Sequence, residues 1–192
     1  MSFIGIDGCP GGWIAVALDG ERHDMRLLPT IVALGTIAAT RVMIDMPIGL
    51  PESGRRRCDL AARALLGPAA RSRIFLDARR PLLAYRAAAD YAAANQWAKR
   101  DGNGISRQLW NILPKIAEVD RFITPGLQGV FREAHPELAF MRLGGSAALP
   151  SKQTPKGRRL RRDVVRAAGI SAIDRWLAAL PRGCAPDDLL DA

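Results

Sequence analysis

Short apolar runs separated by turn residues dominate the N-terminal part of the chain. Four of these runs are predicted to be strands, at residues 3–7, 13–18, 25–28 and 41–45. The glycine-rich stretch 8–12 joins the first two strands, and a helix over 30–39 connects the third strand to the fourth. A helical crossover returns the chain parallel to an earlier strand. The pattern therefore predicts three hairpin-connected strands, a helix, and a fourth strand parallel to the first.

Helical spacing of apolar residues replaces the strand pattern in the middle of the chain. Helices are predicted at residues 58–66, 81–99 and 105–123. The first stops at Gly67-Pro68, the second is uninterrupted, and Pro114 should kink or restart the third. The C-terminal part is predicted to contain a fifth strand over 129–134, a loop over 144–150, a basic helical segment over 151–168, and helices over 171–180 and 186–191.

The order of these elements predicts an α/β fold of ribonuclease H-like type. Its mixed five-stranded sheet has the order 3-2-1-4-5, is flanked by helices, and carries a mostly helical insertion at about residues 53–128. The 192 residues, 48% of them apolar and 24% charged, suffice for one well-buried core and are too few for two ordinary domains. We therefore expect a single domain over 1–192.

The composition indicates where the protein is located and which partners suit it. No apolar run approaches the roughly 20 residues that span a bilayer, and residues 2–7 show neither a basic flank nor a cleavable apolar stretch, so we do not expect secretion. Cys9, Cys58 and Cys184 are odd in number and far apart in the sequence, which argues against a disulfide framework and a cysteine zinc site. These features favour a cytoplasmic protein that does not bind membranes. The net charge of +9 suits a nucleic-acid partner, although an arginine-rich composition alone also produces it.

Carboxylates at strand ends and on the last helix form the best candidate site. Ligands gather at the carboxyl ends of parallel strands, so Asp7 and Asp45 should project from one edge of the sheet. Asp188 and Asp191 have the spacing that places two side chains on one helix face. Carboxylate oxygens are the ligands that Mg²⁺ and Mn²⁺ prefer. Together these acids predict a site for two metal ions roughly 3.5–4 Å apart.

Each acid also has a structural alternative. Asp7 precedes Gly8 and could form a turn, and Asp45 could accept hydrogen bonds from loop amides. Asp188 stands in a first helical turn, where acids favour the helix dipole, whereas Asp191 has no such explanation.

The segment 133–137 adds two candidates after the fifth strand. Glu133 could ligate a metal or orient a water molecule. His135 could act as a general acid near neutral pH, or be an ordinary loop histidine.

Basic residues gather in three clusters that could follow a phosphate backbone. They are Arg55-Arg56-Arg57; Arg71, Arg73, Arg79 and Arg80; and Lys152, Lys156, Arg158, Arg159, Arg161 and Arg162. Arg71, Arg73, Lys152 and Arg158 are the candidate substrate-binding residues. For the third cluster, a solvated helix face is the structural alternative. Cys58 is interpreted as a small core residue in preference to a reactive thiol.

Seven segments together resemble a prokaryotic domain-of-unknown-function family described as predicted nucleases with a ribonuclease H-like fold. They are residues 5–13, 44–51, 57–59, 71–75, 133–137, 151–155 and 187–192. The ending Asp188-Leu189-Leu190-Asp191-Ala192 is similar to the D-x-x-D-A helix of RuvC-like resolvases, whose acids bind metal. The resemblance implies that Asp7, Asp45, Asp188 and Asp191 bind metal, with Glu133 as an addition. Family members usually continue this helix, and a six-residue helix is expected to be marginal unless it is docked.

The residues and the resemblance together predict a metal-dependent nuclease. It would hydrolyse phosphodiester bonds by a two-metal mechanism with Mg²⁺ or Mn²⁺. One alternative is an ATP-binding protein of the actin and sugar-kinase class, which shares the fold and an Asp-Gly phosphate turn but normally needs two copies of the domain. The other is a non-catalytic binding module that keeps the acids for folding.

Overall fold

The computed structural model describes residues 1–100, 102–145 and 149–192. Within this range the chain divides into two compact units, which are described separately. The first comprises Met1–Met46 and Phe122–Ala192, and the second comprises Pro47–Arg121. The single domain expected from the chain length stays a prediction. Of the loop predicted over 144–150, residues 146–148 lie outside the described range.

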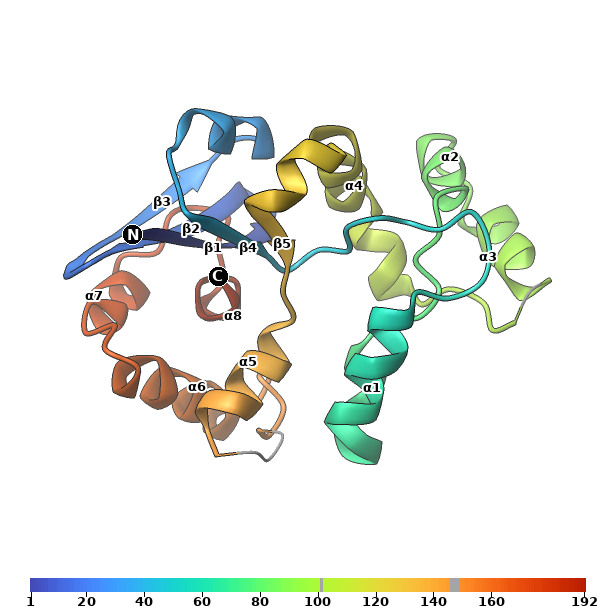
Figure 1. The fold of residues 1–192 in the computed structure, drawn as a ribbon. Coiled ribbons are helices and arrows are strands. Elements are labelled where there is room, and N and C mark those ends of the chain that lie inside the picture. Colours follow the sequence, from blue (N-terminus) through green and yellow to red (C-terminus); the bar gives the residue numbers. More distant parts are fainter. Residues whose placement is uncertain (101, 146–148) are drawn as a thin grey trace. The chain divides into compact units, whose positions relative to one another are not determined.

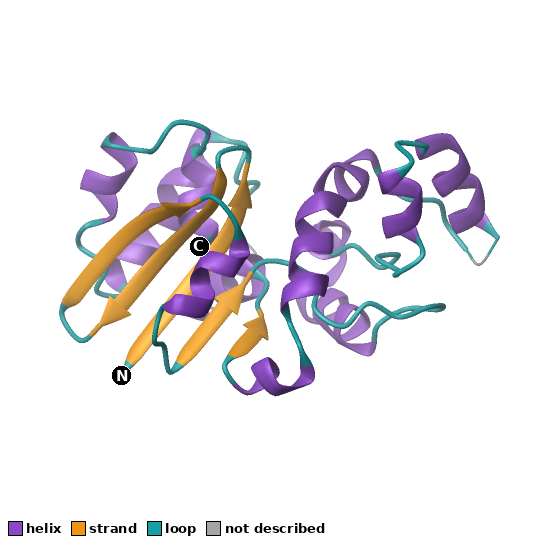
Figure 2. Ribbon diagram, turned by 90° about the horizontal axis from the view of Figure 1, so that it is seen from above, coloured by secondary structure: helices purple, strands orange, loops and turns teal. Residues whose placement is uncertain are grey.

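The first unit contains a mixed five-stranded sheet with the predicted order β3-β2-β1-β4-β5 (Figure 2). The strands are β1 (Ser2–Cys9), β2 (Gly12–Asp19), β3 (Arg22–Leu28), β4 (Arg41–Ile44) and β5 (Phe131–Glu133). β1, β2 and β3 are antiparallel neighbours, while β4 is parallel to both β1 and β5. The predicted α/β sheet is thus confirmed. β3 begins earlier than expected because the hairpin continues its pairing to Arg22 opposite Asp19.

The two faces of the sheet are covered by different elements (Figure 1). On one side lie α5 (Pro136–Leu143), α6 (Pro155–Ala167), α7 (Ile173–Ala178) and α8 (Pro186–Asp191). Their buried side chains form a core with β2, made of Ile14, Val16, Phe140, Ile173, Trp176, Leu189 and Leu190. On the other side lies η1 (Ile31–Thr36). The helix predicted over 30–39 is present but shorter, and it is a 3₁₀ helix, consistent with the poor helix former Gly35 in its middle.

The end of α8 approaches β1 as closely as two main chains allow. A Cβ atom placed on Gly5 would lie 1.6 Å from the carbonyl oxygen of Ala192. A glycine inside a strand commonly marks such a close backbone approach. Leu189 and Leu190 on the same helix are buried in the core. The six-residue helix is therefore docked on the sheet, which meets the condition for its stability.

The second unit is helical. It contains α1 (Arg57–Ala70), η2 (Arg71–Arg73), α2 (Leu82–Ala87), α3 (Tyr91–Lys99) and most of α4 (Arg107–Phe122). η3 (Pro125–Gly129) follows α4 in the first unit. None of the described helices is both long and apolar enough to cross a membrane.

Three helix boundaries in the second unit differ from the prediction. α1 breaks at Gly67, where φ is 67°, but resumes for one more turn. The uninterrupted helix over 81–99 is wrong: Ala89 adopts a left-handed φ of 56°, and Asp90 caps α3 by accepting a hydrogen bond from the Ala93 amide at 2.9 Å. α4 runs through Pro114 without a restart, because its buried apolar side holds the helix on either side of the proline.

Two arginines from the predicted phosphate path are structural. Arg56 is buried and binds both carboxylate oxygens of Asp59, at 2.9 and 2.6 Å. Arg79 is also buried, donates to the Ala98 carbonyl at 3.1 Å, and lies 4.4 Å from the centre of the Trp97 ring. These two side chains cannot follow a phosphate backbone. Cys58 is exposed, so its interpretation as a core residue is wrong.

A third arginine, Arg161 on α6, is fully buried in the first unit. Its guanidinium donates to Glu137 on α5 at 2.6 Å, and to the carbonyls of Pro150 and Gly157 at 2.7 and 3.1 Å. It therefore ties together α5, the first turns of α6 and the segment that precedes α6. Arg161 therefore does not belong to the solvated face that was expected for the basic residues of this helix.

Replacing Arg161 with methionine should destabilise the protein by about 3–5 kcal/mol. The substitution leaves the buried carboxylate of Glu137 without its cation, which costs more than the loss of the pair as a whole. Urea denaturation measures the effect, with Arg159→Met on the exposed side of the same helix as the control. We expect Arg159→Met to change stability by less than about 0.5 kcal/mol. Equal effects of the two substitutions would contradict the structural role of Arg161.

Candidate metal centre

Two of the predicted acids stand side by side at the carboxyl ends of neighbouring strands. In the parallel pairing of β1 with β4, Ile6 is opposite Ile44, so the next residues are Asp7 and Asp45. The ladder continues at this point, because the Asp45 amide donates to the Ile6 carbonyl at 3.1 Å. Both carboxylates therefore leave the sheet at the same level and on the same face.

The third acid reaches this edge from α8. One carboxylate oxygen from each of Asp7, Asp45 and Asp191 lies within 4.8 Å of the other two. The side chain of Asp191 is only 1% exposed, and its Oδ1 atom has no hydrogen-bond partner among the residues that the structure describes. A buried carboxylate oxygen without a partner is costly. We call Asp7, Asp45 and Asp191 the acid triad.

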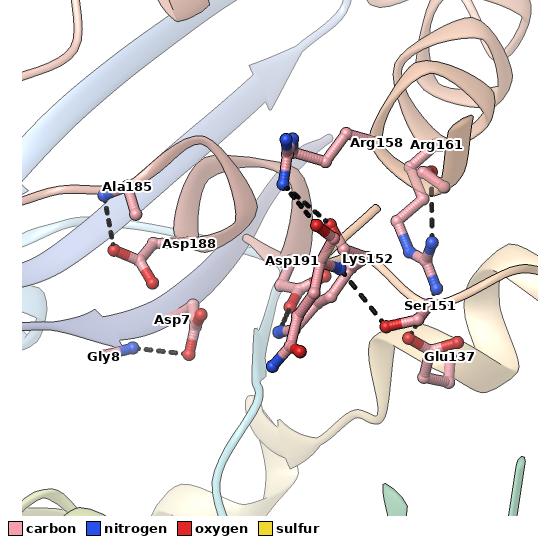
Figure 3. A network of polar contacts seen from close by, with 12 residues as sticks. Asp7, Gly8, Glu137, Ser151, Lys152, Arg158, Arg161, Ala185, Asp188 and Asp191 are labelled. Carbon is pink, nitrogen blue, oxygen red and sulfur yellow. Dashed lines mark hydrogen bonds and ion pairs between the residues drawn. The ribbon is translucent and has the colours of Figure 1, made fainter. Parts of the chain in front are cut away.

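A lysine from the segment before α6 enters the acid triad (Figure 3). The Nζ atom of Lys152 forms an ion pair with Oδ2 of Asp191. Arg158 steadies this segment by donating to the carbonyl of Gln153 at 3.0 Å. Lys152 and Arg158 are also candidate substrate-binding residues, and that role stays a prediction. In this structure Lys152 neutralises an acid, and Arg158 binds the main chain beside it.

The remaining candidates lie around the acid triad or outside it. Asp188 accepts a hydrogen bond from the Ala185 amide at 2.7 Å and so caps α8, and its role as a metal ligand stays a prediction (Figure 3). In the parallel pairing of β4 with β5, Glu133 lies opposite Ile44, the residue that precedes Asp45. His135 directly precedes α5. Arg71 and Arg73 belong to η2 in the second unit, and their role in binding substrate stays a prediction.

Burial raises the pKa of every acid of the triad, and neighbouring carboxylates add to each shift. Burial, together with the charge of Asp191, raises the pKa of Asp45 to about 8. Burial also raises the pKa of Asp7, and the charges of Asp45 and Asp191 raise it further. The pKa of Asp191 rises through burial, although Lys152 opposes this shift. One ammonium is therefore too little positive charge for three ionised carboxylates, and a divalent cation would supply the rest.

Burial would lower the pKa of Lys152, but the charge of Asp191 and its hydrogen bond raise it above the ordinary value. The lysine therefore stays charged at neutral pH. Sequence reasoning missed its position because 39 residues separate it from Asp191, and only the docking of α6 beside α8 brings the two together.

The fold and this site define an α/β protein with an acidic cluster at the carboxyl ends of its central parallel strands. The chain belongs to the family described as Protein of unknown function (DUF429), whose model matches residues 5–192. This match confirms the resemblance to an uncharacterised family and includes every residue of the acid triad. Comparisons with curated proteins and with solved structures gave no match.

Without metal, the protein should become less stable as the pH rises from 5 to 8. The pKa of Asp45 is about 8 in the folded chain and about 3.9 when unfolded, so the folded state holds this proton more tightly. The resulting stabilisation is complete below about pH 4 and is lost as the pH approaches 8. Asp45→Asn removes this loss and should raise the melting temperature at pH 8 by roughly 3–6 °C.

Calorimetry in the presence of a chelator measures this pH dependence. Asp19→Asn, at an exposed position at the end of β2, is the matched control and should keep the wild-type slope. If the melting temperature of Asp45→Asn fell with pH as steeply as that of the wild type, Asp45 would not be the group that causes the loss of stability.

Proposed function

We propose that the chain is a divalent-metal-dependent nuclease of ribonuclease H-like type. The observation that carries this proposal is the convergence of three carboxylates, two from adjacent parallel strands and one from α8, within 4.8 Å. The strand order 3-2-1-4-5 is consistent with the ribonuclease H-like assignment. The net charge of +9 is consistent with a polyanionic substrate.

The donor set of the acid triad fits a hard divalent cation. All three ligands are carboxylate oxygens, which Mg²⁺ and Mn²⁺ favour over nitrogen or sulfur. The buried Oδ1 of Asp191 has no hydrogen-bond partner in the described part of the chain, and a cation would provide one. Asp7, Asp45 and Asp191 would hold the metal, and Asp188 and Glu133 remain the further candidate ligands. A bound cation would supply Lewis-acid polarisation of the phosphate and a more acidic water.

Lys152 has two roles in this proposal. In the metal-free protein its ammonium balances Asp191. Once a cation balances the carboxylates, the ammonium becomes available to a phosphate oxygen of the substrate. The exposed cations Lys156 and Arg159 on α6 follow it in the sequence and extend the positive charge toward solvent. These groups bind and orient the phosphodiester without specifying its bases.

Asp7→Asn should weaken metal binding and slow phosphodiester cleavage. In titration calorimetry, the dissociation constant for Mn²⁺ should rise at least tenfold, because one charged ligand becomes neutral. Cleavage of labelled single-stranded DNA, duplex DNA, four-way junctions and RNA, each with Mg²⁺ or Mn²⁺, should slow by at least about 100-fold. Asp187→Asn on α8 is the matched control, since this residue lies outside the acid triad.

Two outcomes would overturn the nuclease proposal. Equal Mn²⁺ binding by wild type and Asp7→Asn, or no binding by either, would show that the acids serve folding. Tight binding of magnesium-ATP by a wild-type protein that cleaves none of these nucleic acids would favour the ATP-binding alternative.

Lys152→Met should bind Mn²⁺ more tightly than the wild type, by roughly tenfold. Removing an ammonium that pairs with Asp191 removes a charge that repels the incoming cation, and a pairwise effect of about 1.4 kcal/mol corresponds to this factor. The same variant should melt at a lower temperature than the wild type in chelator, because Asp191 then lacks its counterion. Lys156→Met, at an exposed position on α6, serves as the control. Weaker Mn²⁺ binding by Lys152→Met would contradict this role.

A further inference from the structure

Two cysteines that are 175 positions apart in the sequence meet in the first unit. Cys9 ends β1 and is buried, while Cys184 is half-buried in the segment that enters α8. Their Sγ atoms are 3.3 Å apart, and both cysteines are free thiols. The sequence argued against a disulfide because these residues are far apart along the chain. Because the two Sγ atoms are close in space, the separation along the sequence does not prevent a disulfide between Cys9 and Cys184.

The main chain holds the two cysteines together. The Gly11 amide donates to the Gly183 carbonyl at 3.0 Å, which joins the β1–β2 turn to the segment before α8. A Cβ atom on Gly11 would lie 2.7 Å from the carbonyl oxygen of Arg182. Gly183 has a positive φ of 85°, and a Cβ there would lie 2.8 Å from the main chain of Gly11. Both segments therefore carry a glycine where they touch, so the meeting of the thiols does not depend on side-chain rotamers alone.

We propose that Cys9 and Cys184 are a disulfide-forming site that links the end of β1 to the entry of α8. A disulfide needs its sulfurs about 2.05 Å apart, so each thiol has only a fraction of an ångström to move. The bond would close a loop of almost the whole chain. It would also anchor α8, a six-residue helix whose position depends on docking. This proposal does not depend on metal binding or on nuclease activity.

A small-molecule disulfide such as oxidised glutathione supplies the oxidant. The thiolate of Cys184, the more exposed of the pair, attacks one sulfur of oxidised glutathione and releases one glutathione thiolate. The thiolate of Cys9 then attacks Sγ of Cys184, forms the intramolecular bond and releases the second glutathione. The two cysteines lose two electrons and two protons, and the oxidant becomes two molecules of glutathione. A dithiol reductant reverses both steps.

Mass spectrometry of the full chain tests the site. Burial and the hydrogen bond with Cys9 raise the pKa of Cys184 to about 12, so incubation with oxidised glutathione is carried out overnight at mildly alkaline pH. We expect the protein to lose two hydrogen atoms and to yield a peptide pair linked through Cys9 and Cys184. Exposed Cys58 should instead become glutathionylated, which shows in the same spectrum that the oxidant works.

The melting temperature of the linked form should rise by roughly 5–10 °C, because the loop that the bond closes is long. Cys184→Ser should lose both the link and the temperature shift, whereas Cys58→Ser should keep both. The wild-type chain before and after reduction gives the same comparison without any substitution.

Three results would overturn the proposal. One is an unlinked wild-type chain in which Cys58 is fully glutathionylated. Another is a disulfide that involves Cys58. The third is a Cys9–Cys184 link that leaves the melting temperature unchanged or lowers it.

Discussion

The close approach of α8 to β1 is the constraint on which the candidate site depends. Asp7 and Asp45 would form only a pair at the sheet edge without the acid that α8 adds. The helix is too short to be stable alone, so its position comes from Leu189 and Leu190 in the core and from the absence of a side chain at Gly5. A larger residue at position 5 would therefore displace Asp191 without touching any acid. The first glycine of the Gly5-Ile6-Asp7-Gly8 motif is thus as necessary to the geometry of the acid triad as its aspartate.

Much of the sheet could be predicted because its signals are local. Alternating apolar residues and tight turns identified the strands, and the helical crossover implied that β4 runs parallel to β1. This direction then placed Asp7 beside Asp45 without any tertiary information. The helices were predicted less well, since Ala89 and Pro114 sit where packing overrides propensity. Nothing near Ala89 in the sequence marks a left-handed residue.

The charged residues show the limit of sequence reasoning most clearly. Arginines in the same basic segment differ in burial: Arg161 is fully buried against Glu137, whereas Arg159 is exposed. The helical period could have separated them, since Arg161 shares its face with the close-packed Gly157, one turn earlier. Lys152 offered no such signal. Its partner Asp191 lies on an element whose position depends on the whole fold.

Lys152 and the acid triad together set up a conflict between stability and cation binding. Burial and neighbouring carboxylates raise the pKa of each acid of the triad, and an internal ammonium opposes part of this shift in the metal-free state. The same ammonium must weaken the affinity of the site for any cation that replaces it. A site built for folding alone would gain from a second internal cation or from apolar residues of similar size. Within the described residues, the acid triad instead keeps a buried oxygen on Asp191 without a hydrogen-bond partner, and a cation from outside the chain would satisfy it.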